Sequence, residues 1–151
     1  MKPRLETQRD IDIKNKAKIR LTSVYNVEVL DLYEPLYIVD WFIDNNTFVE
    51  FKARNYSHKQ FPTLLLSLHK WMTLQNYVAN GFKAGLCVQW KDFLGYLPVT
   101  KEARGWCTVS HGGRKDRGIE GDVEPCVYIP IDKFVDLLLH FSYASNREHT
   151  I

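Results

Sequence analysis

Apolar and polar residues follow two different periods along the chain, and the changes between these periods mark the expected elements. Helical spacing after a Thr7–Asp10 capping pair predicts a helix over residues 8–22, with these inward positions: Ile13, Ala17, Leu21 and Val24. Alternating positions then predict a meander of three strands at 27–32, 37–43 and 47–52. Turn-forming residues at 44–46 make the last two strands antiparallel.

The second half of the chain is expected to hold two helices and several strands. Pro62 and Thr63 are expected to begin a helix that ends near Gly81 and has this apolar face: Leu64, Leu65, Leu68, Trp71, Met72 and Gln75. Strands are expected at 84–90, 93–98 and 127–129, and residues 100–122 are expected to form a long basic loop with a short strand near 107–109. After Pro130, a final helix is expected to carry Phe134, Leu137, Leu138 and Phe141. This order predicts an α/β fold in which a mixed central sheet is flanked by helices.

Composition adds limits to this fold. The 151 residues are expected to form one domain, residues 1–151, and a content of 45% hydrophobic and 25% charged residues excludes global disorder. No apolar stretch approaches the roughly 20 residues of a membrane span, and no secretory signal is visible. The three cysteines form no CxxC pair, which argues against a disulfide framework and a zinc knuckle. We therefore expect a cytoplasmic protein without membrane contact.

Charge is segregated along the chain although the net charge is only +2. Residues 21–50 contain six acids and no Lys or Arg, whereas residues 51–91 contain six bases and no acid. An acidic centre between basic segments could hold a cation while the flanks bind a polyanion. Chance segregation over two solvated faces is the alternative.

The sharpest feature is Asp40 followed by Glu50, Phe51 and Lys52. Strand alternation places Glu50 and Lys52 on one face, with Phe51 on the opposite face, where a core belongs. If residues 44–46 form a three-residue loop, Asp40 stands opposite Glu50 and the two carboxylates lie about 5 Å apart. A two-residue turn would instead place Asp40 opposite Phe51, and a bulge would change the register again.

Two adjacent carboxylates repel one another unless a cation neutralises them. Oxygen ligands suit Mg²⁺ or Mn²⁺, and a lysine two residues from Glu50 could then hold a water nucleophile or stabilise charge on a phosphate. The alternative is an exposed sheet face with a cross-strand ion pair. We favour the metal site, because acids are disfavoured inside an apolar hairpin.

The spacing of Asp40 and Glu50-Phe51-Lys52 resembles the motif of the PD-(D/E)XK nuclease superfamily, with Val39 at the place of the name-giving proline. By architecture the resemblance covers about residues 5–98 and implies a restriction-endonuclease-like core. It also implies cleavage of DNA, less often RNA, with Mg²⁺. Asp40 and Glu50 would be catalytic metal ligands, the Phe51 backbone carbonyl a further ligand, and Lys52 the catalytic lysine.

Two further details belong to the resemblance. Many members add an acid from the first helix, for which Asp10 is the candidate, because it shares the inward face of Ile13 and Ala17, and Glu6 is the alternative. The chain also resembles small virus-encoded nucleases with a Gly-Arg-x-Asp-Arg-Gly stretch, here residues 113–118. A viral origin would place the protein in the cytoplasm of the host cell.

Basic and polar side chains are the candidates for nucleic-acid binding. They follow the third strand, lie in the second helix or occupy the glycine-containing loop: Arg54, Asn55, Lys59, Lys70, Arg114, Lys115 and Arg117. Glycine lets backbone N–H groups approach phosphate, which the arginine fork binds. The alternatives are ordinary surface loops and, for Lys70, a lysine whose stem lies along the edge of an apolar helix face.

The leading hypothesis is a metal-dependent nuclease that hydrolyses phosphodiester bonds in DNA, which is favoured over RNA. One small domain with one site cuts one strand, so duplex or junction cleavage would require a homodimer. A Holliday junction resolvase is the specific variant to test. The alternatives are an RNA-cleaving endonuclease, a non-catalytic nucleic-acid-binding module of the same fold, and a protein-interaction domain.

Overall fold

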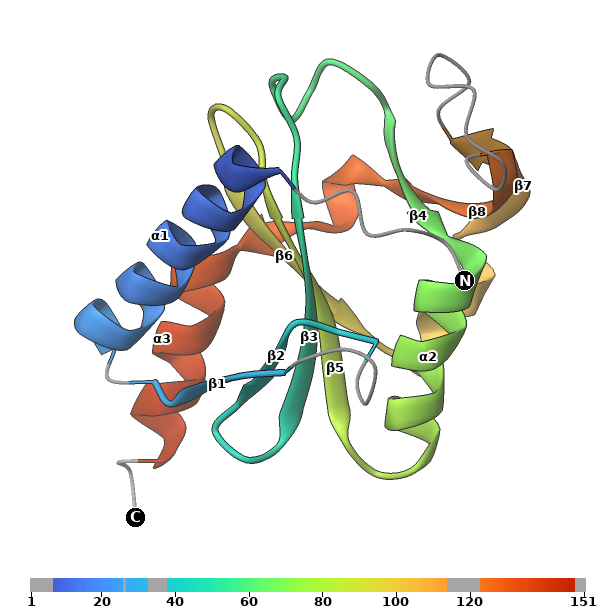
Figure 1. Ribbon diagram of the computed structural model, residues 1–151. Helices are drawn as coiled ribbons and strands as arrows, with labels where there is room; N and C mark the ends of the chain where they lie inside the picture. Colours follow the sequence, from blue (N-terminus) through green and yellow to red (C-terminus); the bar gives the residue numbers. More distant parts are fainter. Residues whose placement is uncertain (1–6, 26, 33–37, 114–122, 149–151) are drawn as a thin grey trace.

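In the part of the chain that the structure describes, two sheets and three α-helices make up the fold (Figure 1). The computed structural model describes residues 7–25, 27–32, 38–113 and 123–148. The larger, mixed sheet has the strand order β1-β2-β3-β5-β6-β9, with these bounds: Val29–Asp31, Trp41–Ile43, Thr47–Ala53, Lys83–Gln89, Leu94–Val99 and Val135–Asp136. The smaller, antiparallel sheet has the order β4-β8-β7, with these bounds: Thr63–Ser67, Val123–Pro130 and Thr108–Gly113.

Helices cover both faces of the larger sheet, as the sequence predicts. α1 (Gln8–Tyr25) and α3 (Leu137–Glu148) contact one another on one face. α2 (Leu68–Ala79) lies on the other face (Figure 1). Two short 3-10 turns, η1 and η2, span Lys101–Gly105 and Ile131–Lys133. None of the described helices is long and apolar enough to cross a membrane.

Two apolar clusters fill the spaces on either side of the larger sheet. One lies under α1 and α3 and includes Ala17, Leu21, Trp41, Ile43, Val49, Phe51, Cys87, Leu137 and Phe141. The other lies between α2, the larger sheet and the smaller sheet and includes Leu64, Leu66, Trp71, Leu74, Leu86, Val88, Val127 and Ile129. Strand β3 pairs antiparallel with β2 and parallel with β5, and it packs against both clusters. This central position determines how deeply its polar side chains are buried.

The β2–β3 hairpin has the register expected for a three-residue loop. The pairs are Ile43–Thr47, Phe42–Phe48 and Trp41–Val49. Asp44 and Asn45 adopt φ angles of 51° and 57°, a left-handed conformation that Asp and Asn tolerate better than most residues. The ladder ends at the Trp41–Val49 pair, one pair before the predicted pairing of Asp40 with Glu50. Asp40 does not pair with Glu50, because its N–H donates a hydrogen bond to the Val49 carbonyl at 3.1 Å.

The second helix begins later than the sequence predicts. Residues 63–67, expected in the helix, form β4 and pair with β8, so that strand alternation directs Leu64 and Leu66 into the core. Ser67 caps the helix instead, and its hydroxyl accepts a hydrogen bond from the Lys70 N–H at 3.2 Å. The prediction was wrong because the pairing of β4 with β8 is a long-range interaction that local helix signals do not contain.

Other boundaries are confirmed or corrected in the same way. The predicted helix end at Gly81 is confirmed, since Gly81 has a φ of 91° and its N–H binds the Val78 carbonyl. Met72 and Val24, predicted to face inward, are 60% and 58% exposed. The predicted loop over 100–122 contains η1 and β7, and the last helix begins after Phe134.

Gly85 lies where the ring of the buried Tyr96 crosses β5. A Cβ atom on Gly85 would stand 2.0 Å from the Tyr96 Oη. We therefore expect Gly85→Ala to lower the free energy of unfolding by about 1–3 kcal/mol, measured by urea denaturation. Gly105→Ala is the matched control, because nothing lies within 4 Å of the added Cβ. Equal stability of the two variants would contradict this packing.

Candidate active site

Strand β3 carries a buried carboxylate and a lysine on its α2 face. Glu50 is 2% exposed although it lies in an otherwise mostly apolar strand. Lys52 follows on the same face, and its Nζ lies 3.2 Å from the Glu50 Oε1. Val49 and Phe51 alternate with these two residues and are buried under α1 and α3. Glu50 and Lys52 therefore share one face, as strand alternation predicts.

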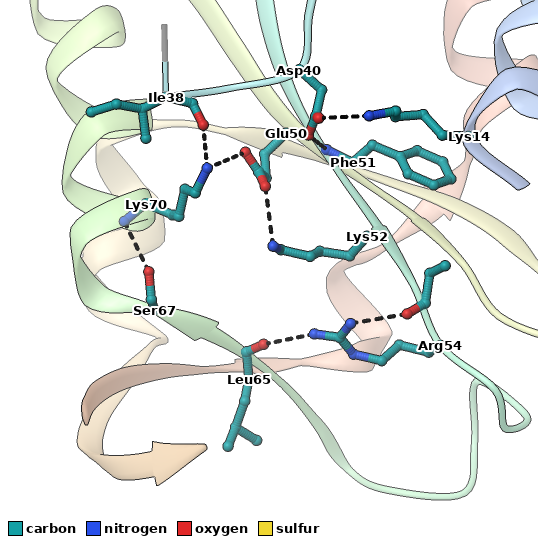
Figure 2. A network of polar contacts seen from close by, with 11 residues as sticks. Lys14, Ile38, Asp40, Glu50, Phe51, Lys52, Arg54, Leu65, Ser67 and Lys70 are labelled. Carbon is teal, nitrogen blue, oxygen red and sulfur yellow. Dashed lines mark hydrogen bonds and ion pairs between the residues drawn. The ribbon is translucent and has the colours of Figure 1, made fainter. Parts of the chain in front are cut away.

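Asp40 reaches the same strand through its side chain. Beyond the last β2–β3 pair, the Phe51 N–H donates a hydrogen bond to the Asp40 Oδ2 at 2.9 Å (Figure 2). The Asp40 carbonyl accepts the Leu32 N–H at 2.9 Å, so the backbone of Asp40 is held as well. Because the N–H and C=O of one strand residue point to the same side, the Phe51 carbonyl is directed toward Asp40 too.

Helix α2 supplies a second lysine at Glu50. The Lys70 Nζ lies 3.2 Å from the Glu50 Oε2 and also donates to the Ile38 carbonyl (Figure 2). Ile38 precedes Asp40 by two residues, so Lys70 connects α2 to the segments that carry both acids. The predicted nucleic-acid candidate Lys70 is thus brought to the acid pair.

Helix α1 supplies a third lysine, which the sequence reasoning missed. The Lys14 Nζ lies 3.2 Å from the Asp40 Oδ1, and the two side chains are only 14% and 17% exposed. Lys14 precedes the buried Ala17 and Leu21 by three and seven residues. This spacing places Lys14 on the inward stripe of the helix, and an inward charge on that stripe was the available signal.

The environment of Glu50 opposes its ionisation. Burial raises the pKa of the Glu50 carboxyl, and the nearby charge of Lys52 lowers it in part. The negative charge of Asp40 raises this pKa further, and Lys70 lowers it. The Glu50 Oε2 is buried and accepts no well-directed hydrogen bond from the described residues, although the Lys70 ammonium is near. The lysines therefore neutralise Glu50 incompletely.

The oxygen atoms gathered here fit a hard divalent cation. Carboxylate and carbonyl oxygens, which Asp40, Glu50 and Phe51 offer, are the ligands that Mg²⁺ and Mn²⁺ prefer. The incompletely partnered Oε2 of Glu50 is an acceptor suited to a further positive charge. Within the described ranges no group of three or more His, Cys, Asp and Glu side chains could hold a metal. The fit rests on two carboxylates and a backbone carbonyl.

The first-helix acid expected from the resemblance has another contact. The Asp10 carboxylate accepts hydrogen bonds from the Thr7 N–H at 3.2 Å and from the Thr7 hydroxyl at 2.9 Å. The predicted capping pair is therefore confirmed, and Asp10 lies one helical turn before Lys14. Glu6, the alternative, lies outside the described residues.

The predicted nucleic-acid residues after β3 lie close to the acid pair in the chain. Arg54 follows Lys52 on the same face, and its guanidinium donates to the Leu65 carbonyl at 3.4 Å, linking β3 to β4 (Figure 2). Asn55 accepts a hydrogen bond from Arg9 of α1 at 2.9 Å, and Lys59 is exposed. The remaining candidates fall outside the described residues: Arg114, Lys115 and Arg117.

Comparisons with known proteins agree with this fold. A family model described as phage putative PDDEXK endonuclease matches residues 1–137. Among solved structures, the chain is similar to Archaeoglobus fulgidus Hjc, a Holliday junction resolvase from an archaeal hyperthermophile. That match has 12% sequence identity and a TM-score of 0.55, and it covers 84% of this chain and 98% of that one. The likeness confirms the expected restriction-endonuclease-like fold. No curated protein matches the chain.

The raised pKa of Glu50 has a consequence for stability. A carboxyl whose pKa is higher in the folded state binds its proton more tightly there, so the contribution of Glu50 to stability falls as pH rises above about 4.5. Glu50→Gln has no such proton to lose. We expect its melting temperature, relative to wild type, to increase by a few degrees as pH is raised from 4 to 7.

The pH series is measured by thermal unfolding against Glu102→Gln, which removes an exposed carboxylate from η1. A relative melting temperature of Glu50→Gln that stays constant or falls with rising pH would show that the lysines outweigh burial at Glu50.

Proposed function

The chain belongs to the family of phage putative PDDEXK endonucleases, and we propose that it is a metal-dependent nuclease that hydrolyses phosphodiester bonds in DNA. The observation that carries the proposal is the meeting of Asp40, Glu50 and Lys52 where the β2–β3 ladder ends. Two carboxylates can hold the metal in metal-assisted phosphodiester hydrolysis, and an ammonium group beside them can stabilise charge on the phosphate.

We assign the metal-holding groups to Asp40, Glu50 and the Phe51 carbonyl. When bound, Mg²⁺ or Mn²⁺ lowers the pKa of water and offsets charge on a phosphate. The chain positions these groups in advance, because the Phe51 N–H holds Asp40 and the central strand holds Glu50. Preorganised ligands avoid the cost of ordering side chains at the moment of reaction.

Lys52 is the group that we assign to the reacting atoms. Its side chain is 31% exposed, compared with 22% for Lys70, so of the two lysines at Glu50 it is the more open to substrate. The Lys52 ammonium donates hydrogen bonds, which orient an attacking water or stabilise negative charge that develops on the phosphate. Lys70, held by Ile38, positions Glu50.

DNA is the substrate that we propose, with a four-way junction as the first branched form to test. Arg54, Asn55 and Lys59 follow the catalytic strand and would contact backbone phosphates. The basic loop over residues 114–117 is predicted to add further contacts. The junction is chosen because the similarly folded archaeal protein is a Holliday junction resolvase. One site cuts one strand, so paired cuts would require a homodimer.

The first test is cleavage of labelled single-stranded DNA, duplex DNA, four-way junctions and RNA with Mg²⁺ or Mn²⁺. We expect wild-type protein to cut DNA only when the metal is present and not after chelation. Lys52→Ala should lower the cleavage rate about 100-fold or more, because the charge that stabilises the transition state is lost. Lys16→Ala, which removes an exposed lysine from α1, is the matched control and should cut normally.

Cleavage that persists in Lys52→Ala, or that needs no metal, would contradict the assigned mechanism. Salt-sensitive DNA binding without any cleavage would favour the non-catalytic binding module. Preferential cleavage of RNA would support the assigned catalytic site but would show that the substrate is RNA and not DNA.

Lys59 tests the assigned path of the DNA backbone. If this exposed lysine contacts one phosphate, Lys59→Ala should weaken binding to all DNA sequences alike. The slope of log affinity against log salt should become less steep by about 0.7–0.9, measured by fluorescence anisotropy. An unchanged salt dependence would show that the DNA backbone does not contact Lys59.

A further inference from the structure

An exposed aromatic ring lies in the chain shortly after the catalytic strand. Phe61 is 47% exposed and belongs to the connection between β3 and β4. Its ring meets the ring of Tyr56 edge to face, with 5.0 Å between the centroids and 87° between the planes. Single exposed hydrophobic residues are common on protein surfaces, so the surroundings of this ring decide what it can bind.

The connection that carries this ring is tied to the turn between β5 and β6. Asp92 of the turn accepts the His58 N–H at 2.9 Å and lies 3.2 Å from the His58 Nδ1. The Lys91 N–H donates to the Tyr56 carbonyl at 3.2 Å, and the His58 ring stacks on Phe93 with centroids 4.7 Å apart. The two segments meet near the top of Figure 1. The exposed ring is therefore supported by a fixed surface, which lowers the cost of ordering when a ligand binds.

This surface lies close to the acid pair along the chain. Tyr56, the edge-to-face partner of Phe61, follows Lys52 by four residues, and four residues span at most about 14 Å. Stacked nucleotides rise about 3.4 Å each along one strand of DNA. The two rings are therefore within a few nucleotides of the phosphate that Lys52 would contact.

The charge around the ring suits a polyanionic ligand. Lys59 and Lys91 are exposed on the two segments, residues 51–91 contain no acid, and Asp92 is engaged by His58. A nucleic-acid backbone can follow such positive charge while one of its bases lies on an aromatic face. Bases inside a duplex have both faces covered by their neighbours. An unpaired base is therefore the form that fits this ring.

We propose that Phe61 is a specificity-determining residue of this active site, and that its ring stacks on an unpaired nucleobase of the DNA near the cut. The inference rests on the proposed function of the same site. It assigns a preference for single-stranded, flapped or gapped DNA over a blunt duplex. In a fully paired four-way junction no base is free, so Phe61 contributes nothing to the binding of its arms.

The chain offers a matched control at the opposite end of the same strands. Phe82 is 45% exposed and also meets a neighbouring ring, that of Phe48, edge to face at 5.3 Å. Phe82 directly precedes β5, whose first residue pairs with the first residue of β3, whereas Phe61 follows the end of β3. Phe82→Ala therefore removes an equally exposed ring from the other end of the sheet.

The test measures binding by fluorescence anisotropy with three labelled ligands: single-stranded DNA, a blunt duplex of the same length and single-stranded RNA of the same sequence. The buffer contains EDTA, so that the wild-type chain binds without cutting. We expect Phe61→Ala to weaken binding of single-stranded DNA about 5- to 150-fold, the range that the stacking of one base on an aromatic ring supplies. Binding of the duplex should change by less than about twofold.

Further variants separate stacking from other roles. Because stacking neutralises no phosphate, Phe61→Ala should leave the slope of log affinity against log salt unchanged, whereas Lys59→Ala makes it less steep. Phe61→Trp, which keeps an aromatic face, should bind single-stranded DNA like wild type, and Phe61→Leu, which keeps only apolar bulk, should bind it like Phe61→Ala. Phe82→Ala should match wild type on every ligand.

The inference is overturned if Phe61→Ala binds single-stranded DNA as tightly as wild type, or if it weakens the binding of single strand and duplex alike. Full affinity of Phe61→Leu would show an apolar contact instead of stacking and would overturn it as well. Tighter binding of the RNA strand, dependent on Phe61, would overturn the choice of DNA.

Cleavage separates this inference from the proposed function. If the protein cuts DNA with metal while Phe61→Ala leaves single-strand binding unchanged, the nuclease stands and the role of Phe61 falls. If binding depends on Phe61 as expected but no DNA is cut, the stacking contact stands and the proposed function falls. A chain that binds no nucleic acid contradicts both.

Discussion

The hydrogen bond from the Phe51 N–H to the Asp40 carboxylate is the contact on which the site depends. β3 is a seven-residue strand, but β2 pairs with only its first three residues. A buried N–H beyond that point would cost about 1–3 kcal/mol if it stayed unpaired. Asp40 satisfies it with a side chain instead of a backbone carbonyl. The short hairpin partner is therefore what brings a carboxylate beside Glu50, and the Phe51 carbonyl is directed to the same side.

The lysines compensate the charges of two acids that lie close together in a mostly buried site. Lys14 approaches from α1 and Lys70 from α2, so the acid pair is held from both faces of the sheet. Such partly buried ion pairs contribute little net stability, because desolvation offsets their attraction. Their effect is geometric: they fix each carboxylate in one orientation. The raised pKa of Glu50 shows that the compensation is incomplete, which leaves the site receptive to further positive charge.

The sequence predicted those parts of the fold that short-range pattern controls. Alternation in β3 and the turn residues Asp44 and Asn45 indicated the hairpin register and the shared face of Glu50 and Lys52. The predicted start of α2 was wrong because the pairing of β4 with the distant strand β8 determines where the helix begins. Lys14 was missed because a single lysine among the apolar positions of a helix is typical of the edge of an apolar face. Its role becomes visible only when its partner Asp40 is known. The first-helix acid was expected from the resemblance, whereas the described structure places a lysine against Asp40.

The position of β3 between β2 and β5 has a consequence for the newly made chain. Glu50 and Lys52 are translated before Lys70 of α2, which follows 18 residues after Lys52, and before β5, which begins at Lys83. Domains fold as units once enough chain has emerged. The motif is thus translated long before the strand that carries it has its parallel neighbour. The acid pair can therefore reach its final surroundings only after α2 and β5 have been made.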